Sequence, residues 1–133
     1  MGNIERITWK DKMLACIIKA ETDVEKTTFL TPSEYNFQVG FVAYPKDGEI
    51  PAHVHRPVER RIFETFEVLL VRKGRCEVDI FNDERERIAT RELREGDLLL
   101  VVEGGHGFRM LEDAVLLEVK QGPYLGDDSK ETF

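Results

Sequence analysis

The sequence predicts an all-β fold made of many short strands. Apolar residues recur at every second position along much of the chain, which is the spacing of a strand with one buried face. Turn residues such as Asn82-Asp83 and Gly96-Asp97 separate these segments at nearly regular intervals. A succession of short strands and turns is typical of a β-sandwich or a β-barrel.

The predicted strands follow one another from residue 14 to residue 119. Residues 35–44 illustrate the pattern, since Phe37, Val39, Phe41 and Ala43 would share one face. Residues 21–28 are expected to form a short charged helix or a loop, and residues 122–133 an irregular tail. The expected strands are residues 14–19, 35–44, 67–73, 76–81, 87–93, 98–102, 106–110 and 114–119.

Length and composition indicate one folded domain over residues 1–133. Apolar residues make up 41% and charged residues 34% of the chain, which is ordinary for a soluble globular protein. A chain of 133 residues buries roughly two-thirds of its unfolded surface, which is enough for one core.

Charge and targeting signals exclude several classes of partner. The net charge is −7, with 19 Lys and Arg scattered among 26 Asp and Glu, so we expect no nucleic-acid partner. There is no signal-peptide pattern and no apolar stretch of membrane-spanning length, which predicts a cytoplasmic protein without a membrane partner. Cys16 and Cys76 lie in apolar segments and are expected to be buried free thiols.

The chain has three histidines, and two of them form the sequence His53-Val54-His55. On a strand, residues i and i+2 point to the same face, so both imidazoles would project together and could chelate one metal ion. Two exposed histidines on an edge strand would give the same pattern. This spacing alone therefore leaves both interpretations open.

The surrounding residues resemble the two sequence motifs of the cupin family. Glu67 is followed after six residues by Gly74, and Gly96 precedes His106 by nine intervening residues. The resemblance covers residues 37–119 and implies a double-stranded β-helix, or jelly-roll barrel, with short N-terminal and C-terminal extensions. It also implies that one divalent ion is held in the barrel mouth by His53, His55, Glu67 and His106.

The motifs depart from the family pattern at several positions. The gap between His55 and Glu67 is seven or eight residues longer than usual, and Glu59 fits the usual gap but lacks the glycine that should follow. We favour Glu67 as the carboxylate ligand, because it also opens an apolar strand. Three further departures are Gly48, one residue too close to His53, Val102 in place of proline, and Met110 in place of asparagine.

The predicted donor set limits the metal and suggests its role. Three imidazoles and one carboxylate suit Fe, Mn, Ni, Co or Zn, and an octahedral ion with four protein ligands keeps two positions open. An open position permits a substrate oxygen to be polarised or a bound water to be acidified. Neither cysteine belongs to a paired thiolate motif.

Other residues are candidates for binding the substrate or moving a proton. Arg56, Arg60 and Arg61 lie in the segment inserted after His55 and could hold an acidic or phosphorylated substrate, or form a solvated loop. Gln38 could turn its amide into the barrel, and Glu118 shares a strand face with Lys120. Glu67, Glu118 and Tyr124 are the candidate acids and bases.

Two functions remain open after the sequence analysis. The first is a metalloenzyme of the isomerase, epimerase or dioxygenase type that acts on a sugar derivative or on a hydroxy or keto acid. The second is a non-catalytic metal-containing module that binds a carbohydrate or another small molecule. The tail sequence resembles small cupins associated with bacterial surface-polysaccharide synthesis. We also expect a homodimer that shares residues 14–18 as an edge strand.

Overall fold

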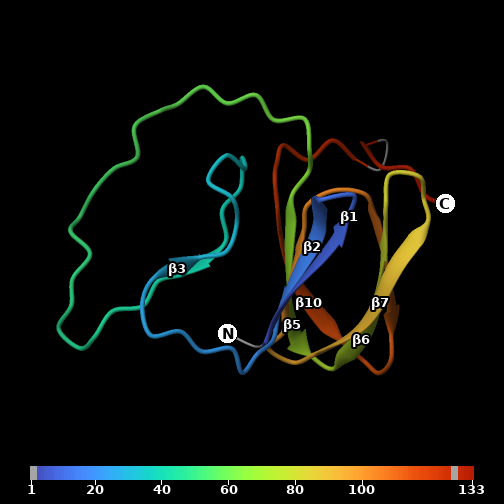
Figure 1. Cartoon of the computed structure of the whole chain (residues 1–133), viewed down its shortest axis with the longest axis horizontal. Coiled ribbons are helices and arrows are strands. Elements are labelled where there is room, and N and C mark those ends of the chain that lie inside the picture. The colour runs from blue at the N-terminus through green and yellow to red at the C-terminus, as the bar shows by residue number, and fades with distance from the viewer. Residues whose placement is uncertain (1–2, 127–128) are drawn as a thin grey trace. The chain divides into compact units, whose positions relative to one another are not determined.

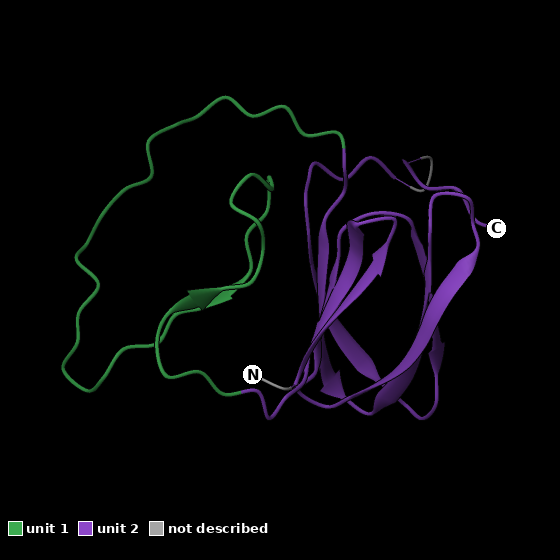
Figure 2. Ribbon diagram, viewed as in Figure 1, with its two compact units in different colours: residues 1, 23–63 green, residues 2–22, 64–133 purple. Residues whose placement is uncertain are grey.

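The computed structural model describes residues 3–126 and 129–133, which form ten strands and no α-helix. These residues fall into two compact units: unit 1 comprises residues 23–63, and unit 2 comprises the rest (Figure 2). The strands are β1 (Ile4–Trp9), β2 (Lys12–Ile18), β3 (Thr28–Phe29), β4 (Gly40–Phe41), β5 (Glu67–Lys73), β6 (Arg75–Phe81), β7 (Arg87–Arg94), β8 (Leu98–Val101), β9 (Gly105–Met110) and β10 (Val115–Lys120).

The larger sheet of unit 2 has the antiparallel strand order β1-β2-β8-β5-β10 (Figure 1). Its register places Ile17 opposite Leu99 and Leu99 opposite Leu69. Residues that are directly opposite each other point to the same face of a sheet. These three side chains therefore form one continuous row, and each is at most 5% exposed.

The smaller sheet of unit 2 has the order β7-β6-β9. β6 alternates strictly, with Cys76, Val78 and Ile80 buried and the residues between them half-buried. The half-buried residues carry polar contacts to the neighbouring strands, such as the ion pair between Glu77 and Arg109. One face of this sheet is therefore apolar and the other is charged.

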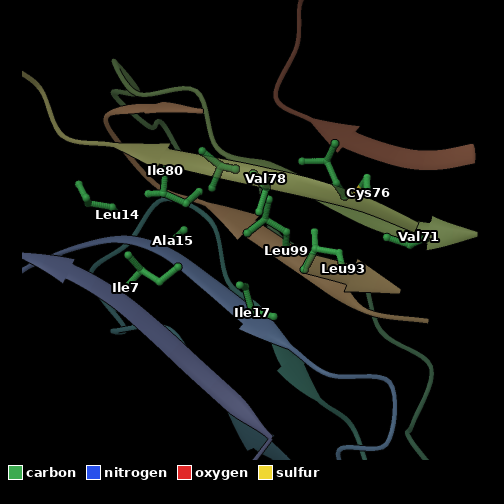
Figure 3. Packing of buried hydrophobic residues seen from close by; sticks show 12 residues of the cluster. Ile7, Leu14, Ala15, Ile17, Val71, Cys76, Val78, Ile80, Leu93 and Leu99 are labelled. Atoms are coloured by element: carbon green, nitrogen blue, oxygen red, sulfur yellow. The ribbon is translucent and has the colours of Figure 1, made fainter. Parts of the chain in front are cut away.

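The main core of unit 2 draws side chains from both sheets into one cluster (Figure 3). The larger sheet contributes Ile17, Leu69 and Leu99, and the smaller sheet contributes Val78 and Leu93. Burying a side chain of this size contributes about 1.5–3 kcal/mol relative to leaving it in water. The inner faces of the two sheets therefore pack on each other, although neither sheet closes into a barrel in the described residues.

The turns before β6 and before β8 each depend on one residue, Gly74 in the first turn and Asp97 in the second. Gly74, between β5 and β6, has φ +79°, and a Cβ there would lie 2.2 Å from the carbonyl oxygen of Asp113. The carboxylate of Asp97 is buried before β8 and accepts hydrogen bonds from the backbone N–H groups of Ala20 and Arg94, both at 2.8 Å. These contacts fix the ends of the strands that carry the core.

Unit 1 contains little regular structure. β3 and β4 form a two-residue antiparallel pair, and Leu30 and Thr31 beside them are buried. The Thr31 hydroxyl accepts a hydrogen bond from the Val39 N–H at 3.1 Å. Residues 44–64, by contrast, are all exposed and form no strand.

Most strand predictions are confirmed and two are wrong. The six predicted strands from residue 67 onward correspond to β5 through β10, with ends that differ by at most one residue. The predicted strand over residues 35–44 is reduced to Gly40–Phe41, and residues 53–55 form no strand. Residues 21–28 are not helical, and β1 and β3 were not predicted.

The all-β class is confirmed, whereas the jelly-roll barrel and the single domain over residues 1–133 stay predictions. Cys16 and Cys76 are buried free thiols as expected, and burial raises the pKa of both. The predicted edge position of residues 14–18 is wrong. These residues lie in β2, which is paired with β1 on one side and β8 on the other, and the edges of this sheet are β1 and β10.

Candidate functional site

Glu67 and His106 lie together in unit 2. Glu67 is the first residue of β5 in the larger sheet, and His106 is the second residue of β9 in the smaller sheet. The Oε2 atom of Glu67 lies 2.9 Å from the Nε2 atom of His106. Both side chains are mostly buried, with 14% of Glu67 and 27% of His106 exposed.

The register of each sheet explains why these two side chains meet. Glu67 lies opposite Val101, and His106 lies opposite Ile80. Val101 and Ile80 are both buried members of the core cluster, so Glu67 and His106 project from the inner faces of their sheets. The pair is therefore an extension of the core that carries polar groups.

The backbone on both sides of the pair is tightly held. The Phe66 N–H donates to the side-chain oxygen of Gln121 at 3.0 Å, immediately before Glu67. Gly104 begins the approach to His106 with φ +78°, and a Cβ there would lie 2.1 Å from the carbonyl oxygen of Phe81. Only glycine fits this bend, so the Gly-Gly sequence before His106 fixes the path of the backbone that leads to His106.

The Glu67–His106 pair is polar but incompletely satisfied. Nδ1 of His106 is buried without a hydrogen-bond partner among the described residues, and the buried Oε2 of Glu67 has only its 2.9 Å contact with Nε2 of His106. Buried polar atoms are normally hydrogen-bonded, because an unpaired one costs about 1–3 kcal/mol. A bound cation would stabilise this pair.

The electrostatic surroundings keep Glu67 ionised. Contact with the His106 imidazole lowers the pKa of the Glu67 carboxyl, and burial raises it by a smaller amount. The charges of Lys120 and Lys130 lower the pKa further. Glu67 is therefore available as an anionic ligand at neutral pH.

His53 and His55 lie in unit 1, in the exposed segment without strands. Their ring centroids are 5.2 Å apart with an edge-to-face orientation. Nδ1 of His53 lies 2.8 Å from the carbonyl oxygen of Pro51. The two imidazoles are thus neighbours, although not through the strand geometry that the sequence suggested.

The four predicted ligands fall into two pairs, one in each unit. No group of three or more His, Cys, Asp or Glu side chains suited to a metal ion occurs among residues 3–126 and 129–133. The distance between the two donor atoms of the pair in unit 2 nevertheless matches the spacing of neighbouring ligands on a metal ion. Neighbouring donors on an octahedral ion with bonds of about 2.1 Å lie about 3.0 Å apart, close to the 2.9 Å between Oε2 and Nε2.

The two candidate carboxylates have different surroundings. Glu67 contacts His106 inside unit 2, whereas Glu59 lies in the exposed segment of unit 1. The choice of Glu67 over Glu59 stays a prediction, and the contact with His106 supports it.

The predicted anion-binding arginines are exposed. Arg56, Arg60 and Arg61 form no ion pair with any residue that the structure describes. Within unit 1, a shallow open hollow is lined by Val54, His55, Arg56, Val58 and Arg60. Pairing with local acids therefore does not occupy these guanidinium groups.

The amide of Gln38 is used by local contacts in unit 1. Its oxygen accepts from the Thr31 hydroxyl at 2.8 Å, and its nitrogen donates to the carbonyl oxygens of Pro32 and Tyr35 at 2.9 and 3.1 Å. These bonds hold the bend between β3 and β4. They use both donor positions of the amide nitrogen and one acceptor position of the oxygen, which leaves little hydrogen-bonding capacity for a substrate.

The other candidate acids and bases lie at the C-terminal side of unit 2. Glu118 in β10 pairs with Lys120, with 3.2 Å between Oε2 and Nζ. Tyr124 follows β10 and is 82% exposed.

Comparisons with protein-family models, characterised proteins and solved structures give no match for this chain. No helix in the described residues is long and apolar enough to cross a membrane.

Proposed function

We propose that the chain is a metal-dependent cupin in which His53, His55, Glu67 and His106 bind one divalent ion. The contact between Glu67 and His106 carries this proposal. The sequence motifs singled out both residues as ligands, one from each motif, and they meet at 2.9 Å from two different sheets. If the resemblance to the two motifs arose by chance, there would be no reason for Glu67 and His106 to be in contact.

The proposed activity is a reaction on a small oxygenated molecule, such as a sugar derivative or a hydroxy or keto acid. Fe, Mn, Ni, Co or Zn would supply Lewis acidity to a carbonyl or enediol oxygen at this site. The proposed roles of the chain are to bind the substrate and to move a proton through Glu67, Glu118 or Tyr124. An isomerase, an epimerase or a dioxygenase fits this description.

Metal content of single variants tests the ligand set. We expect untagged wild-type protein to bind about one divalent ion per chain, and His53→Ala, His55→Ala, Glu67→Ala and His106→Ala to lower metal affinity by at least tenfold. Elemental analysis after dialysis against a defined metal concentration gives the stoichiometry.

Glu59→Ala is the matched control for this experiment, because it removes the rival carboxylate from the exposed segment. It should bind metal like the wild type. Full metal binding by His106→Ala would refute the two-motif site, and loss in Glu59→Ala with retention in Glu67→Ala would exchange the two carboxylates.

A non-catalytic binding module is the second candidate function. It is favoured by the surroundings of two candidate catalytic groups, because Glu118 is already paired with Lys120 and Tyr124 is 82% exposed. Neither is a buried group held ready for proton transfer. If the metal-loaded protein binds a sugar acid but neither exchanges its α-proton with deuterium in NMR spectra nor consumes dissolved oxygen, the results favour the binding function.

We also propose a homodimer, with β10 rather than residues 14–18 as the shared edge. Leu117 and Val119 lie on one face of this edge strand, opposite Leu70 and Val68, and are each about half exposed. Antiparallel pairing of two copies centred on Leu117 would align these side chains in one apolar stripe. Sedimentation should show a dimer for the wild type and a 15.4 kDa monomer for Leu117→Lys.

A further inference from the structure

Two glycines precede His106, and the backbone conformation requires glycine only at the first of them. Gly104 has φ +78°, in the left-handed region where any other side chain is strained. Gly105 has no positive φ and is the first residue of strand β9. The backbone at position 105 would therefore accept a side chain, and only the space around it excludes one.

The aromatic ring of Phe133 fills the space beside Gly105. A Cβ on Gly105 would lie 2.8 Å from Cζ of this ring, whereas packed carbon atoms are about 3.5–4.0 Å apart. The ring also packs edge-to-face on Phe81, with 5.0 Å between ring centroids. Phe81 lies opposite Gly105 in the register of β6 and β9. The Phe133 ring therefore packs on two positions that share one face of the smaller sheet.

This face is the outer face of the smaller sheet. Successive residues of a strand point to opposite faces. Ile80 belongs to the core cluster and lies opposite His106, so these two positions face inward. Phe81 and Gly105, their neighbours in sequence, face outward. Phe133 thus contacts the start of β9 from the side opposite to the His106 imidazole.

Arg85, in the turn between β6 and β7, fastens the same C-terminal segment. Its guanidinium group lies 5.1 Å from the centroid of the Phe133 ring and pairs with Glu131 at 2.9 Å. The turn is held by Asn82, which is 1% exposed and whose side-chain oxygen accepts hydrogen bonds from two backbone N–H groups of the turn, at 3.0 and 2.9 Å. The ring is therefore fixed from the turn as well as from β6 and β9.

The start of β9 depends on such support because little else holds it. In the part of the chain that the structure describes, β9 pairs with β6 alone and is an edge of the smaller sheet. The two glycines at its beginning have more conformational freedom than other residues. His106 is the next residue, and its imidazole must lie 2.9 Å from Glu67 for the two donors to share an ion.

We infer that Phe133 is a positioning residue for His106. By packing on Gly105 from the outer face, the ring fixes the start of β9 and so holds the imidazole at its distance from Glu67. This inference rests on the proposed function, because the position of His106 affects metal affinity only if His106 is a ligand. It gives residues 129–133 a role that their sequence does not indicate.

The contact made by Phe133 is small compared with the core of unit 2. Phe133 remains 61% exposed, whereas core residues such as Leu99 are fully buried. Removing the ring should therefore leave the fold of unit 2 in place while it frees the start of β9. This difference separates positioning from a general loss of stability.

The metal affinity of Phe133→Ala tests the inference. We expect Zn²⁺ to bind about tenfold more weakly than to the wild type, the lower end of the effect of residues that orient metal ligands. Phe133→Leu keeps an apolar side chain beside Gly105 and should restore most of the affinity. Equilibrium titration measures the affinity, and urea denaturation measures stability. Wild-type affinity in Phe133→Ala would overturn the inference, as would a loss that only accompanies unfolding.

Two glycines of β9 supply matched variants. Gly105→Ala places a methyl group where the Phe133 ring lies, so it should displace the ring and lower the affinity like Phe133→Ala. Gly107→Ala changes the same face of β9 at a position where a Cβ would meet no described atom within 4 Å, and should leave the affinity unchanged. Equal losses in both glycine variants would show a general effect of altering β9 and would refute the inference.

The double variant that combines Gly105→Ala with Phe133→Ala identifies the contact itself. Both single changes break the same contact, so their combination should lower the affinity no further than either alone. Losses that multiply would show that the two residues act independently, and would refute a shared contact.

Failure of this inference is distinguishable from failure of the proposed function. In metal-free Phe133→Ala, backbone N–H groups of residues 105–107 should exchange with solvent about tenfold faster than in the wild type, and those of β2 should not change. Faster exchange in a protein that takes up no metal would reject the metal site and keep the contact between Phe133 and β9. Normal metal uptake by the wild type, with exchange and affinity unchanged in the variant, would reject only the positioning role.

Discussion

The two units of this chain show how differently alternating apolar residues behave in different surroundings. In unit 2, β2, β8 and β5 lie side by side, and each supplies apolar residues at facing positions. In unit 1, Phe37, Val39 and Phe41 alternate in the same way, yet only Gly40–Phe41 forms a strand. Alternation produces a long strand where a neighbour offers a matching row of side chains.

The composition of the exposed segment explains part of this contrast. Residues 44–64 include Pro45, Pro51 and Pro57, each of which lacks the N–H that a ladder needs. Charged residues occur throughout the same segment. The large apolar side chains of this segment, such as Ile50, Val54 and Phe63, are exposed, so their burial does not offset the entropy of ordering it.

Limited proteolysis should reveal the largest difference between the units. Trypsin is expected to cut wild-type protein after Arg60 or Arg61 at least a hundredfold faster than after any arginine in β5, β6 or β7, whereas the Arg56–Pro57 bond resists trypsin because a proline follows the arginine. Cleavage within the paired strands requires unfolding, which costs about 5–15 kcal/mol in a typical domain. Mass spectrometry of timed digests identifies the cut sites. First cuts inside unit 2 would contradict the contrast.

A divalent ion should reduce this difference if the proposed metal site exists. Binding at His53 and His55 would order the neighbouring segment, so added metal should slow cleavage after Arg60 and Arg61 by about tenfold or more. The same addition should have no effect on His106→Ala. Equal protection of both proteins would show that the histidines of unit 1 bind metal without His106.

Core truncation should differ between the units by several kcal/mol. Leu99→Ala removes a fully buried side chain in β8 and should lower the free energy of unfolding by about 2–5 kcal/mol. Phe63→Ala, at a position that is 91% exposed, should change it by less than about 0.5 kcal/mol. Urea denaturation measures both, and equal effects would show that burial does not distinguish these positions.

The turn before β8 should tolerate substitution less well than the bend in unit 1. Asp97→Ala leaves the N–H groups of Ala20 and Arg94 without their acceptor, at a cost of about 1–3 kcal/mol in unfolding free energy. Gln38→Ala removes only contacts within unit 1 and should leave the unfolding transition of unit 2 in place. Thermal unfolding followed by circular dichroism compares the two variants.

The smallest effect is expected at the surface of unit 2, in the pH dependence of the stability contributed by the ion pair between Glu5 of β1 and Arg91 of β7. Arg91 donates hydrogen bonds to the Glu5 carboxylate and lowers the pKa of Glu5. The stability from this pair should be present above the ordinary glutamate pKa of about 4.3 and be lost as pH falls through the lower folded value. Because both groups are over 40% exposed, it should not exceed about 1 kcal/mol.

Glu5→Gln provides the comparison for the pH effect. Its urea midpoint should be slightly lower than that of the wild type at pH 7, because the variant has no carboxylate to pair with Arg91, and this difference should shrink as the pH falls below the ordinary glutamate pKa. A constant difference between the two proteins over this range would show that the ion pair has no measurable effect.

The strands of unit 2 were predictable because the polarity of each side chain matches the face of the sheet on which it lies. Cys76, Val78 and Ile80 alternate with polar residues, since one face of β6 packs on the core and the other meets water. Gly74 and Gly96 marked turns because their positive φ angles strain any other residue. The positions of Glu67 and His106 in the two motifs also predicted that both residues belong to one site.

Only the tertiary structure decided which strands pair and which residues lie next to each other. β1 (Ile4–Trp9) has a mixed sequence and becomes a strand because β2 pairs with it. Lys120 stands opposite Glu67 through the register of two strands that are far apart in sequence. The last residue of the chain is held against unit 2 because the Phe133 ring packs on Phe81. Pairing and packing depend on long-range complementarity, which a local pattern of residues does not contain.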